Sequence, residues 1–253
     1  FLLLAHIEAD ELIHIDDDMS YKDLLKSRPT IAEEKEAMKL AGYVSQYGGY
    51  LYMVHLSSGI TINKFINQYP DLINHRFFIE SCPQYFTFSD QDLKQDDGYL
   101  YTLAPPLRTI KELNLLKRHF SNIYSIGTDH CAFNIEDKIN RPLKAIPLGI
   151  GGIENSFDLM FQKFGDCVID KMSKNISKLY DKLQTTGQIR ENYMANIFVY
   201  DLKQTIIDQH HGCTDYNLYM GKKKMGTTKH LFLRGKPVIL NGVLQEAIGR
   251  EVS

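Results

Sequence analysis

The sequence predicts an α/β fold with a parallel sheet, followed by a smaller β-rich part. Two observations carry this prediction: short apolar segments alternate with helical patterns along most of the chain, and near residue 187 the alternation gives way to strand patterns punctuated by glycine. The chain has 253 residues, of which 43% are hydrophobic and 24% charged, an ordinary globular balance. A chain of this length has enough apolar surface to bury a sizeable core.

The first strand–helix–strand unit is predicted at the start of the chain. Leu2–Ile7 is a continuous apolar run, which is typical of a buried strand. Thr30 and Glu33 have the spacing of a capping box at the start of a helical pattern, and Gly48–Gly49 ends that pattern. Tyr50–Leu56 is the second predicted strand, and a short helix follows it.

Two more strands are predicted in the next part of the chain. Phe77–Glu80 is the third strand, and a long loop, Gln84–Leu107, separates it from a second capping box at Thr109 and Glu112. The helix that begins at this box leads to the fourth strand, Ile123–Gly127. Strands that alternate with helices in this way are expected to lie parallel in one sheet.

The chain becomes irregular after the fourth strand and then changes character. Asn134–Gly152 is rich in proline and glycine and is expected to be a loop. A helix with an apolar face between Phe157 and Phe164 follows it. Ile189–Asp201 and Leu231–Val243 are read as strands of a small β appendage.

The number of predicted strands leaves two architectures open. A closed parallel barrel needs about eight strands, and this chain supplies half of them. The sheet is therefore either open and doubly wound, or one half of a barrel whose other half lies upstream. The chain begins with Phe1 rather than Met, so we expect it to be part of a longer protein.

Composition excludes several classes of function. Lys and Arg (29) nearly balance Asp and Glu (31), which leaves no basic surplus for nucleic acid or an anionic membrane surface. The longest apolar runs are too short to span a bilayer, and the N-terminus lacks the pattern of a signal peptide. The four cysteines have no CxxC spacing, so reduced thiols and a cytoplasmic location are expected.

Three residues with metal-ligating side chains follow three of the predicted strands. His6, His55 and Asp129 each come at the end of an apolar strand, and the carboxyl ends of parallel strands share one edge of the sheet. Two imidazoles and a carboxylate suit zinc or a similar divalent ion, although they are too few to close a site. Each of them alone is also typical of a hydrogen-bonded core or turn residue. His130, which points elsewhere, is expected either to support a ligand from behind or to have a structural role.

Other reactive side chains are given structural interpretations. His210 and His211 are neighbours that would point to opposite faces of a strand. Cys82 and Cys131 lie near strand ends, but no accompanying histidine and amide pattern supports a thiol nucleophile. The Gly149–Gly152 run lacks the flanking features of a phosphate-binding loop.

A series of short strings, in order along nearly the whole chain, indicates a family. They are Ala5-His6-Ile7-Glu8, Ser27-Arg28-Pro29, Val54-His55-Leu56-Ser57-Ser58, Glu80-Ser81-Cys82-Pro83-Gln84-Tyr85, Ala104-Pro105-Pro106-Leu107-Arg108, Gly127-Thr128-Asp129-His130-Cys131-Ala132-Phe133, Gly152-Ile153-Glu154 and Asp215-Tyr216-Asn217-Leu218-Tyr219. On these strings the chain resembles the C-terminal part of the cyclic amidohydrolases, above all dihydropyrimidinase and hydantoinase.

The resemblance implies a fold, a cofactor and an activity. It implies the C-terminal half of a TIM-like (β/α)8 amidohydrolase barrel over residues 1–186 and part of a small composite β-sandwich over residues 187–253. It implies a pair of divalent metals, usually zinc, bridged by a carboxylated lysine that lies outside this chain. The implied reaction opens a dihydropyrimidine or 5-substituted hydantoin ring to an N-carbamoyl amino acid, as in pyrimidine degradation, in a homotetramer.

The resemblance also assigns roles to particular residues. His6 and His55 match the histidines that hold one metal, and Asp129 matches the aspartate that binds the other and shuttles the proton in catalysis. Main-chain groups near Ala104 and Leu148 match those that bind the cyclic substrate.

The chain departs from the family pattern in places. The His-x-His pair, the bridging lysine and a tyrosine that assists the oxyanion would all lie upstream of Phe1, so this chain alone is expected to be inactive. Ala104 stands where the family usually has Ser, and Leu148 where it often has Asn, changes that main-chain contacts tolerate.

Two alternative functions stay open. Some relatives keep the fold without the metals and serve as assembly or interaction proteins, such as the collapsin response mediators; retention of His6, His55 and Asp129 argues against this function. The other alternative is a sister enzyme, allantoinase or dihydroorotase. A dihydroorotase would need a cation near its carboxylated substrate, and Arg108 is the candidate for it.

Overall fold

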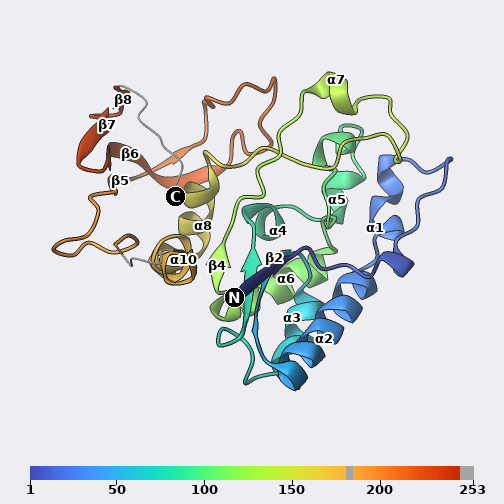
Figure 1. The fold of residues 1–253 in the computed structure, drawn as a ribbon. Coiled ribbons are helices and arrows are strands. Elements are labelled where there is room, and N and C mark those ends of the chain that lie inside the picture. The colour runs from blue at the N-terminus through green and yellow to red at the C-terminus, as the bar shows by residue number, and fades with distance from the viewer. Residues whose placement is uncertain (181–184, 246–253) are drawn as a thin grey trace. The chain divides into compact units, whose positions relative to one another are not determined.

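The computed structural model describes residues 1–180 and 185–245 (Figure 1). These residues pack into two compact units. The first consists of Phe1–Ser156 together with His211–Leu218, and the second consists of Phe157–His210 with the chain from Tyr219 onward. The predicted boundary between barrel and sandwich, after residue 186, lies within the second unit and stays a prediction.

The first unit is built on a parallel sheet of four strands, as the sequence predicts. The strands lie in chain order and are β1 (Leu2–Ala5), β2 (Tyr50–Leu56), β3 (Phe77–Ser81) and β4 (Ser125–Ile126). The fourth strand is shorter than the predicted Ile123–Gly127 because only two of its residues pair with β3. The sheet is open in the described residues, with β1 and β4 at its edges.

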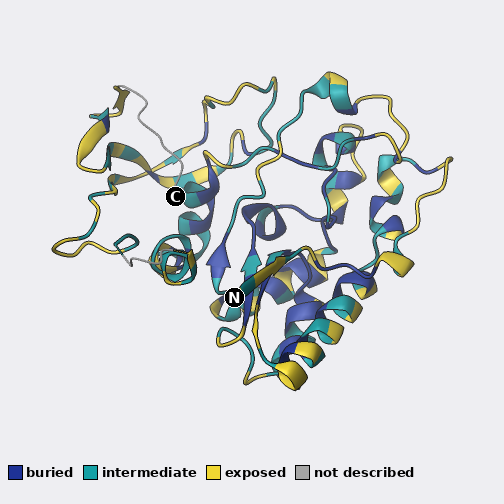
Figure 2. Cartoon of the chain, viewed as in Figure 1, coloured by how far each residue is buried: buried dark blue, intermediate teal, exposed yellow. Residues whose placement is uncertain are grey.

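The predicted helices connect these strands. They are α2 (Thr30–Tyr47), α3 (Gly59–Gln68) and α6 (Ile110–Arg118), and α3 packs against both of the others. Their inner residues and the sheet form the core, where Phe65 and Phe77 are buried with ring centroids 4.6 Å apart. Figure 2 shows exposed residues along the outer side of α2.

The long loop predicted over Gln84–Leu107 is partly helical. It contains α4 (Pro83–Thr87), which begins with proline at its first turn, and α5 (Asp90–Leu93), where Ser89 and Asp92 form a capping box. The capping signal was present in the sequence, but each helix spans too few residues to show a period. The other short helices of this unit are α1 (Leu24–Ser27) and α7 (Ile135–Lys138).

One predicted capping box is confirmed and the other is wrong. Thr109 and Glu112 form a reciprocal box at the start of α6. At the start of α2 no such box forms: Thr30 donates its hydroxyl to Glu112 (2.7 Å), and Glu33 turns into the core. There the Glu33 carboxylate accepts hydrogen bonds from the N–H groups of Ser57 (2.9 Å) and Ser58 (3.0 Å).

The second unit combines three helices with an antiparallel sheet. Its elements are α8 (Ser156–Phe164), α9 (Cys167–Met172), α10 (Lys174–Tyr180), β5 (Ile197–Ile206), β6 (Lys223–Leu233), β7 (Lys236–Leu240) and β8 (Val243–Leu244), and the strands lie in chain order. The β-rich character is confirmed, but β5 begins eight residues after the predicted Ile189, and α9 and α10 were not predicted. Phe157 of α8 contacts Phe198 and Tyr200 of β5, with ring centroids 4.9 and 5.1 Å away.

A segment distant in sequence completes the first unit. The Asp215 carboxylate accepts the N–H of Ile135 at 3.0 Å, and the side chains of Asn217 and Asn155 are 2.8 Å apart. His211 contacts the Glu154 carboxylate through both its N–H and its ring. Within the described residues, no helix is long and apolar enough to cross a bilayer.

Substitution of Glu33 distinguishes its buried role in the core from the predicted role in a capping box. A capping box accepts Gln in place of Glu, so Glu33→Gln would then cost almost nothing. In the core, Glu33→Gln puts an amide donor beside the N–H of Ser58 and removes the charge that faces Arg108. We therefore expect the free energy of unfolding, measured by urea titration, to fall by about 3 kcal/mol. The control is Glu36→Gln on the same helix, which breaks a surface pair with Lys39 worth at most about 1 kcal/mol. Equal midpoints for the two variants would contradict the buried role.

Candidate functional site

The carboxyl edge of the parallel sheet carries the three residues singled out in the sequence. His6 follows β1, His55 lies at the end of β2 and Asp129 follows β4. The backbones of His55 and Asp129 are left-handed, with φ of 42° and 47°, and the pairing of β2 with β3 is irregular between Met53 and Leu56. Non-glycine residues seldom adopt this conformation, and it concentrates at functional sites. The strand ends are thus shaped to redirect these side chains.

The structure brings His6 and His55 into direct contact. Nδ1 of His6 lies 3.1 Å from Nε2 of His55, and the two rings meet edge to face with centroids 4.8 Å apart. Two nitrogens that ligate one tetrahedral zinc at its usual bond length lie about 3.3 Å from each other. The pair therefore has the spacing of two ligands of a single ion.

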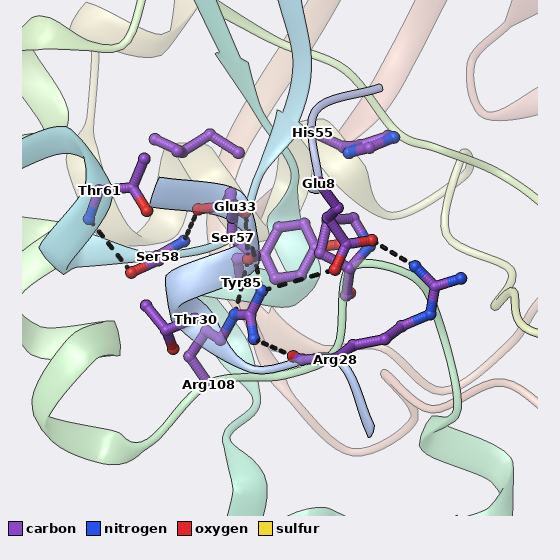
Figure 3. Close-up of polar contacts among 12 residues, drawn as sticks. Glu8, Arg28, Thr30, Glu33, His55, Ser57, Ser58, Thr61, Tyr85 and Arg108 are labelled. Carbon is purple, nitrogen blue, oxygen red and sulfur yellow. Dashed lines mark hydrogen bonds and ion pairs between the residues drawn. The ribbon is translucent and has the colours of Figure 1, made fainter. Parts of the chain in front are cut away.

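Glu8 orients the ring of His6 from behind. Its Oε2 lies 2.9 Å from Nε2 of His6, which leaves Nδ1 to face His55. A carboxylate behind a histidine fixes the ring tautomer and raises its basicity toward a metal. Burial opposes ionisation of Glu8, but the hydrogen bond to His6 and the charges of Arg28 and Arg108 outweigh burial and lower the pKa of Glu8 (Figure 3).

Burial favours the neutral form of His55. It is buried, and burial lowers its pKa although the nearby Asp129 charge raises it. A neutral imidazole has the free electron pair that a metal ligand requires. Its Nδ1 has no hydrogen-bond partner among the described residues, and its Nε2 faces His6.

Glu80 is a site residue that the sequence interpretation missed. It lies on β3 between the strands of His55 and Asp129, and its carboxylate accepts the N–H of His55 (3.2 Å) and the hydroxyl of Tyr52 (2.6 Å). Burial raises the pKa of Glu80, and the charge of Asp129 adds to this. A Cβ at Gly127 would lie 2.4 Å from this carboxyl group, so the glycine makes room for it. The signal was a carboxylate directly after the apolar run Phe77–Ile79.

The third predicted ligand does not complete a cluster. Asp129 influences the pKa of both His55 and Glu80, which places it in the same region. In residues 1–180 and 185–245, however, no group of three His, Cys, Asp or Glu side chains is arranged to hold a metal ion. The facing histidines fit two ligands of one ion, and the metal-binding role of all three residues stays a prediction.

The two segments predicted to bind substrate lie against each other. Thr102, two residues before Ala104, accepts the N–H of Gly149 at 3.0 Å, and Gly149 directly follows Leu148. The Thr102 hydroxyl also approaches the carbonyl of Pro147 at 3.3 Å. Ala104 and Leu148 are both half-buried. Their main-chain groups are therefore close enough to act on one ligand, which stays a prediction.

Other candidates prove structural or unavailable. Nδ1 of His130 accepts the N–H of Gly152 at 3.1 Å, and burial raises the pKa of the Cys82 thiol far above its ordinary value. The candidate contact of Arg108 with a substrate carboxylate is wrong. Arg108 is buried and donates to the Ser57 hydroxyl (2.9 Å) and the Arg28 carbonyl (2.7 Å), so it cannot reach a ligand.

Removal of the Glu8 carboxylate tests its role behind His6. In the full-length protein, we expect Glu8→Gln to weaken zinc binding about 10- to 100-fold, because the amide leaves the His6 tautomer unfixed. Competition with a chromophoric chelator at pH 7 measures the affinity. Glu11→Gln, which breaks an exposed pair with Lys35 in the same segment, serves as the control and should bind zinc as the unchanged protein does. An unaltered affinity in Glu8→Gln would refute the orienting role.

Known proteins support the resemblance seen in the sequence strings. The chain matches no family profile. The D-phenylhydantoinase of Escherichia coli is 26% identical over 243 residues, covering 88% of this chain and 52% of that protein, so the chain spans about half the length of the curated relatives it matches. D-Hydantoinase (dihydropyrimidinase) from Thermus sp. superposes with a TM-score of 0.89 at 23% identity over 97% of this chain and 58% of its own.

Two further solved structures share the fold. Dihydropyrimidinase from Brevibacillus agri gives a TM-score of 0.87 at 23% identity, covering 96% of this chain and 57% of its own. Dihydroorotase from Saccharomyces cerevisiae gives 0.64 at 14% identity, covering 90% and 63%. The chain is thus similar in sequence to a hydantoinase over 88% of its length, and it shares the fold of hydantoinases and dihydropyrimidinases.

Proposed function

We propose that this protein is a metal-dependent hydrolase that opens a cyclic amide, a dihydropyrimidine or a 5-substituted hydantoin, to an N-carbamoyl amino acid. The observation that carries this proposal is the contact of Nδ1 of His6 with Nε2 of His55 at 3.1 Å, at the carboxyl ends of two parallel strands. Active sites of parallel α/β folds are built at this edge. The resemblance to hydantoinases supports the substrate class.

The proposed site needs strands beyond the four described here. β1 has β2 as its single described neighbour, and Leu3 and Leu4 on it are half exposed, which is unusual for a parallel strand. We propose that residues 1–186 contribute one half of a TIM-like barrel and residues 187–253 part of a β-sandwich. The other barrel half would bring the His-x-His pair and the carboxylated lysine. A homo-oligomer is proposed from the family alone.

Each site residue has a proposed part in the reaction. His6 and His55 would hold one metal, with Glu8 fixing the first ring and Glu80 the backbone of the second. Bound metals make a hydroxide available near neutral pH and polarise the amide carbonyl. Asp129 would hold the second metal and carry the proton from the attacking water to the departing ring nitrogen.

The main chain beside Ala104 and Leu148 would bind the substrate. A cyclic imide presents alternating N–H and C=O groups along its ring, which backbone groups can match without any particular side chain. This accounts for the substitution of Ala and Leu at positions where the family usually has polar residues. The specificity would then depend on how the two backbone segments are held.

One specific observation argues against a dihydroorotase function for this protein. The cation proposed to meet the carboxylate of its substrate, Arg108, is committed to Ser57 and Arg28 in the core. The structural likeness to the yeast dihydroorotase shows the fold alone.

A substrate panel tests the proposal with the full-length protein. We expect ring opening of dihydrouracil and hydantoin in the presence of zinc, with little or no action on dihydroorotate, followed by loss of absorbance and by product chromatography. His55→Ala should lower kcat/KM by at least about 10³-fold, because a metal ligand is lost. The control is His14→Ala, whose side chain is 75% exposed in a surface pair with Asp16, and its activity should be unchanged. Full activity of His55→Ala would rule out the metal mechanism.

A further inference from the structure

Lys138 at the end of α7 is a buried amine that the proposed reaction does not use. Its side chain is completely inaccessible to solvent, which is rare for lysine. Burial lowers its pKa to about 7, so the group keeps at least two N–H donors in either protonation state. Burying an amino group costs free energy unless its N–H groups form hydrogen bonds.

The amino group of Lys138 donates hydrogen bonds to backbone carbonyls in two separate segments. Nζ lies 2.6 Å from the carbonyl of Gly149 and 3.0 Å from both the carbonyl and the hydroxyl of Thr102. The carbonyl of Leu100 is 3.5 Å away. Among the described residues Lys138 forms no ion pair; its hydrogen-bond partners are neutral oxygens, and Nζ also lies 5.8 Å from the ring centroid of Phe133. An apolar side chain would fill the same space, and what lysine adds is directional bonding to these oxygens.

The two segments are the ones assigned to substrate. Thr102 lies two residues before Ala104, Gly149 one residue after Leu148, and the N–H of Gly149 donates to the carbonyl of Thr102. The next residue, Ile150, accepts the N–H of Cys131 at 3.0 Å, so the same junction continues to the segment of Asp129. Gly149 allows this close approach, since a Cβ there would lie 2.6 Å from the Cys131 carbonyl.

We propose that Lys138 is a positioning residue for substrate binding, whose amino group clamps the backbone beside Ala104 to the backbone beside Leu148. This inference rests on the proposed function. The clamp fixes the spacing of two sets of main-chain groups that must meet one rigid ring together, so it sets substrate affinity and selectivity between ring sizes. Lys138 itself touches no substrate.

The principal test is Lys138→Met in the full-length protein. Methionine fills the volume but donates no hydrogen bond, so the two segments lose their common anchor. We expect KM for dihydrouracil to rise about tenfold or more while kcat changes by less than about threefold, the sign of lost binding that is uniform along the reaction. Lys144→Met, in the same segment but in an exposed pair with Asp17, is the matched control and should leave both constants unchanged.

A second variant covers the case in which Lys138→Met fails to fold. Thr102→Val keeps the shape of the side chain and removes one acceptor of the clamp together with the hydroxyl contact to Pro147. We expect a smaller rise in KM with kcat again unchanged. A fall in kcat at constant KM in both variants, or no change in either constant, would overturn the proposal.

Hydrogen exchange of backbone amides detects the clamp without a measurement of enzyme activity. The amide of Gly149 should exchange faster in Lys138→Met or Thr102→Val, while the amide of Leu51, bonded to Arg76 in the sheet, keeps its protection. If the unchanged protein opens no cyclic amide, the proposed function fails and with it the substrate role, while this exchange result still decides whether the clamp exists. Equal exchange at Gly149 in all proteins would refute the clamp.

Discussion

The positions of the candidate site residues depend on charged groups that are buried beneath the carboxyl edge of the parallel sheet (Figure 3). Arg108 is enclosed between the carboxylates of Glu8 and Glu33, each 4.0 Å from its terminal nitrogen, and it donates to the Ser57 hydroxyl. Because a buried charge is expensive without a partner, each of these groups restricts where the others can lie. One carboxylate holds the start of α3 through Ser57, and the other holds the ring of His6.

The site is therefore held by groups that do not themselves enter it. The left-handed backbone of His55 is kept by the Glu80 carboxylate, and Gly127 gives that carboxylate its space. Conformational strain of this kind persists where surrounding contacts over-determine the backbone. The rings of His6 and His55 accordingly face each other.

Regular elements and strand-end residues could be predicted from the sequence, because they follow local periodicity. The four parallel strands, the three main helices and the Thr109–Glu112 cap all have signals within a few residues. The partners of Glu33 lie 24 and 25 residues away, and nothing local distinguishes this carboxylate from a capping one. Lys138 was missed for the same reason, because its role comes from contacts between separate segments. Glu80 had a local signal, its place directly after the apolar run Phe77–Ile79, but its contacts with Tyr52 and His55 are a property of the fold. The ends of the predicted strands drew attention to His6 and His55, but the distance between the two rings is a property of the fold.

The docking of His211–Leu218 on the first unit has a consequence for synthesis of the chain. This unit contains a segment made after more than fifty residues of the second one, so it cannot be completed when its own strands and helices have left the ribosome. Until then three residues of the first unit lack their later partners, namely Asp215 for Asn134, His211 for Glu154 and Asn217 for Asn155. At translation rates of about 5–20 residues per second this wait lasts several seconds. The two units are thus interleaved in time as well as in sequence, and no single cut of the polypeptide separates them intact.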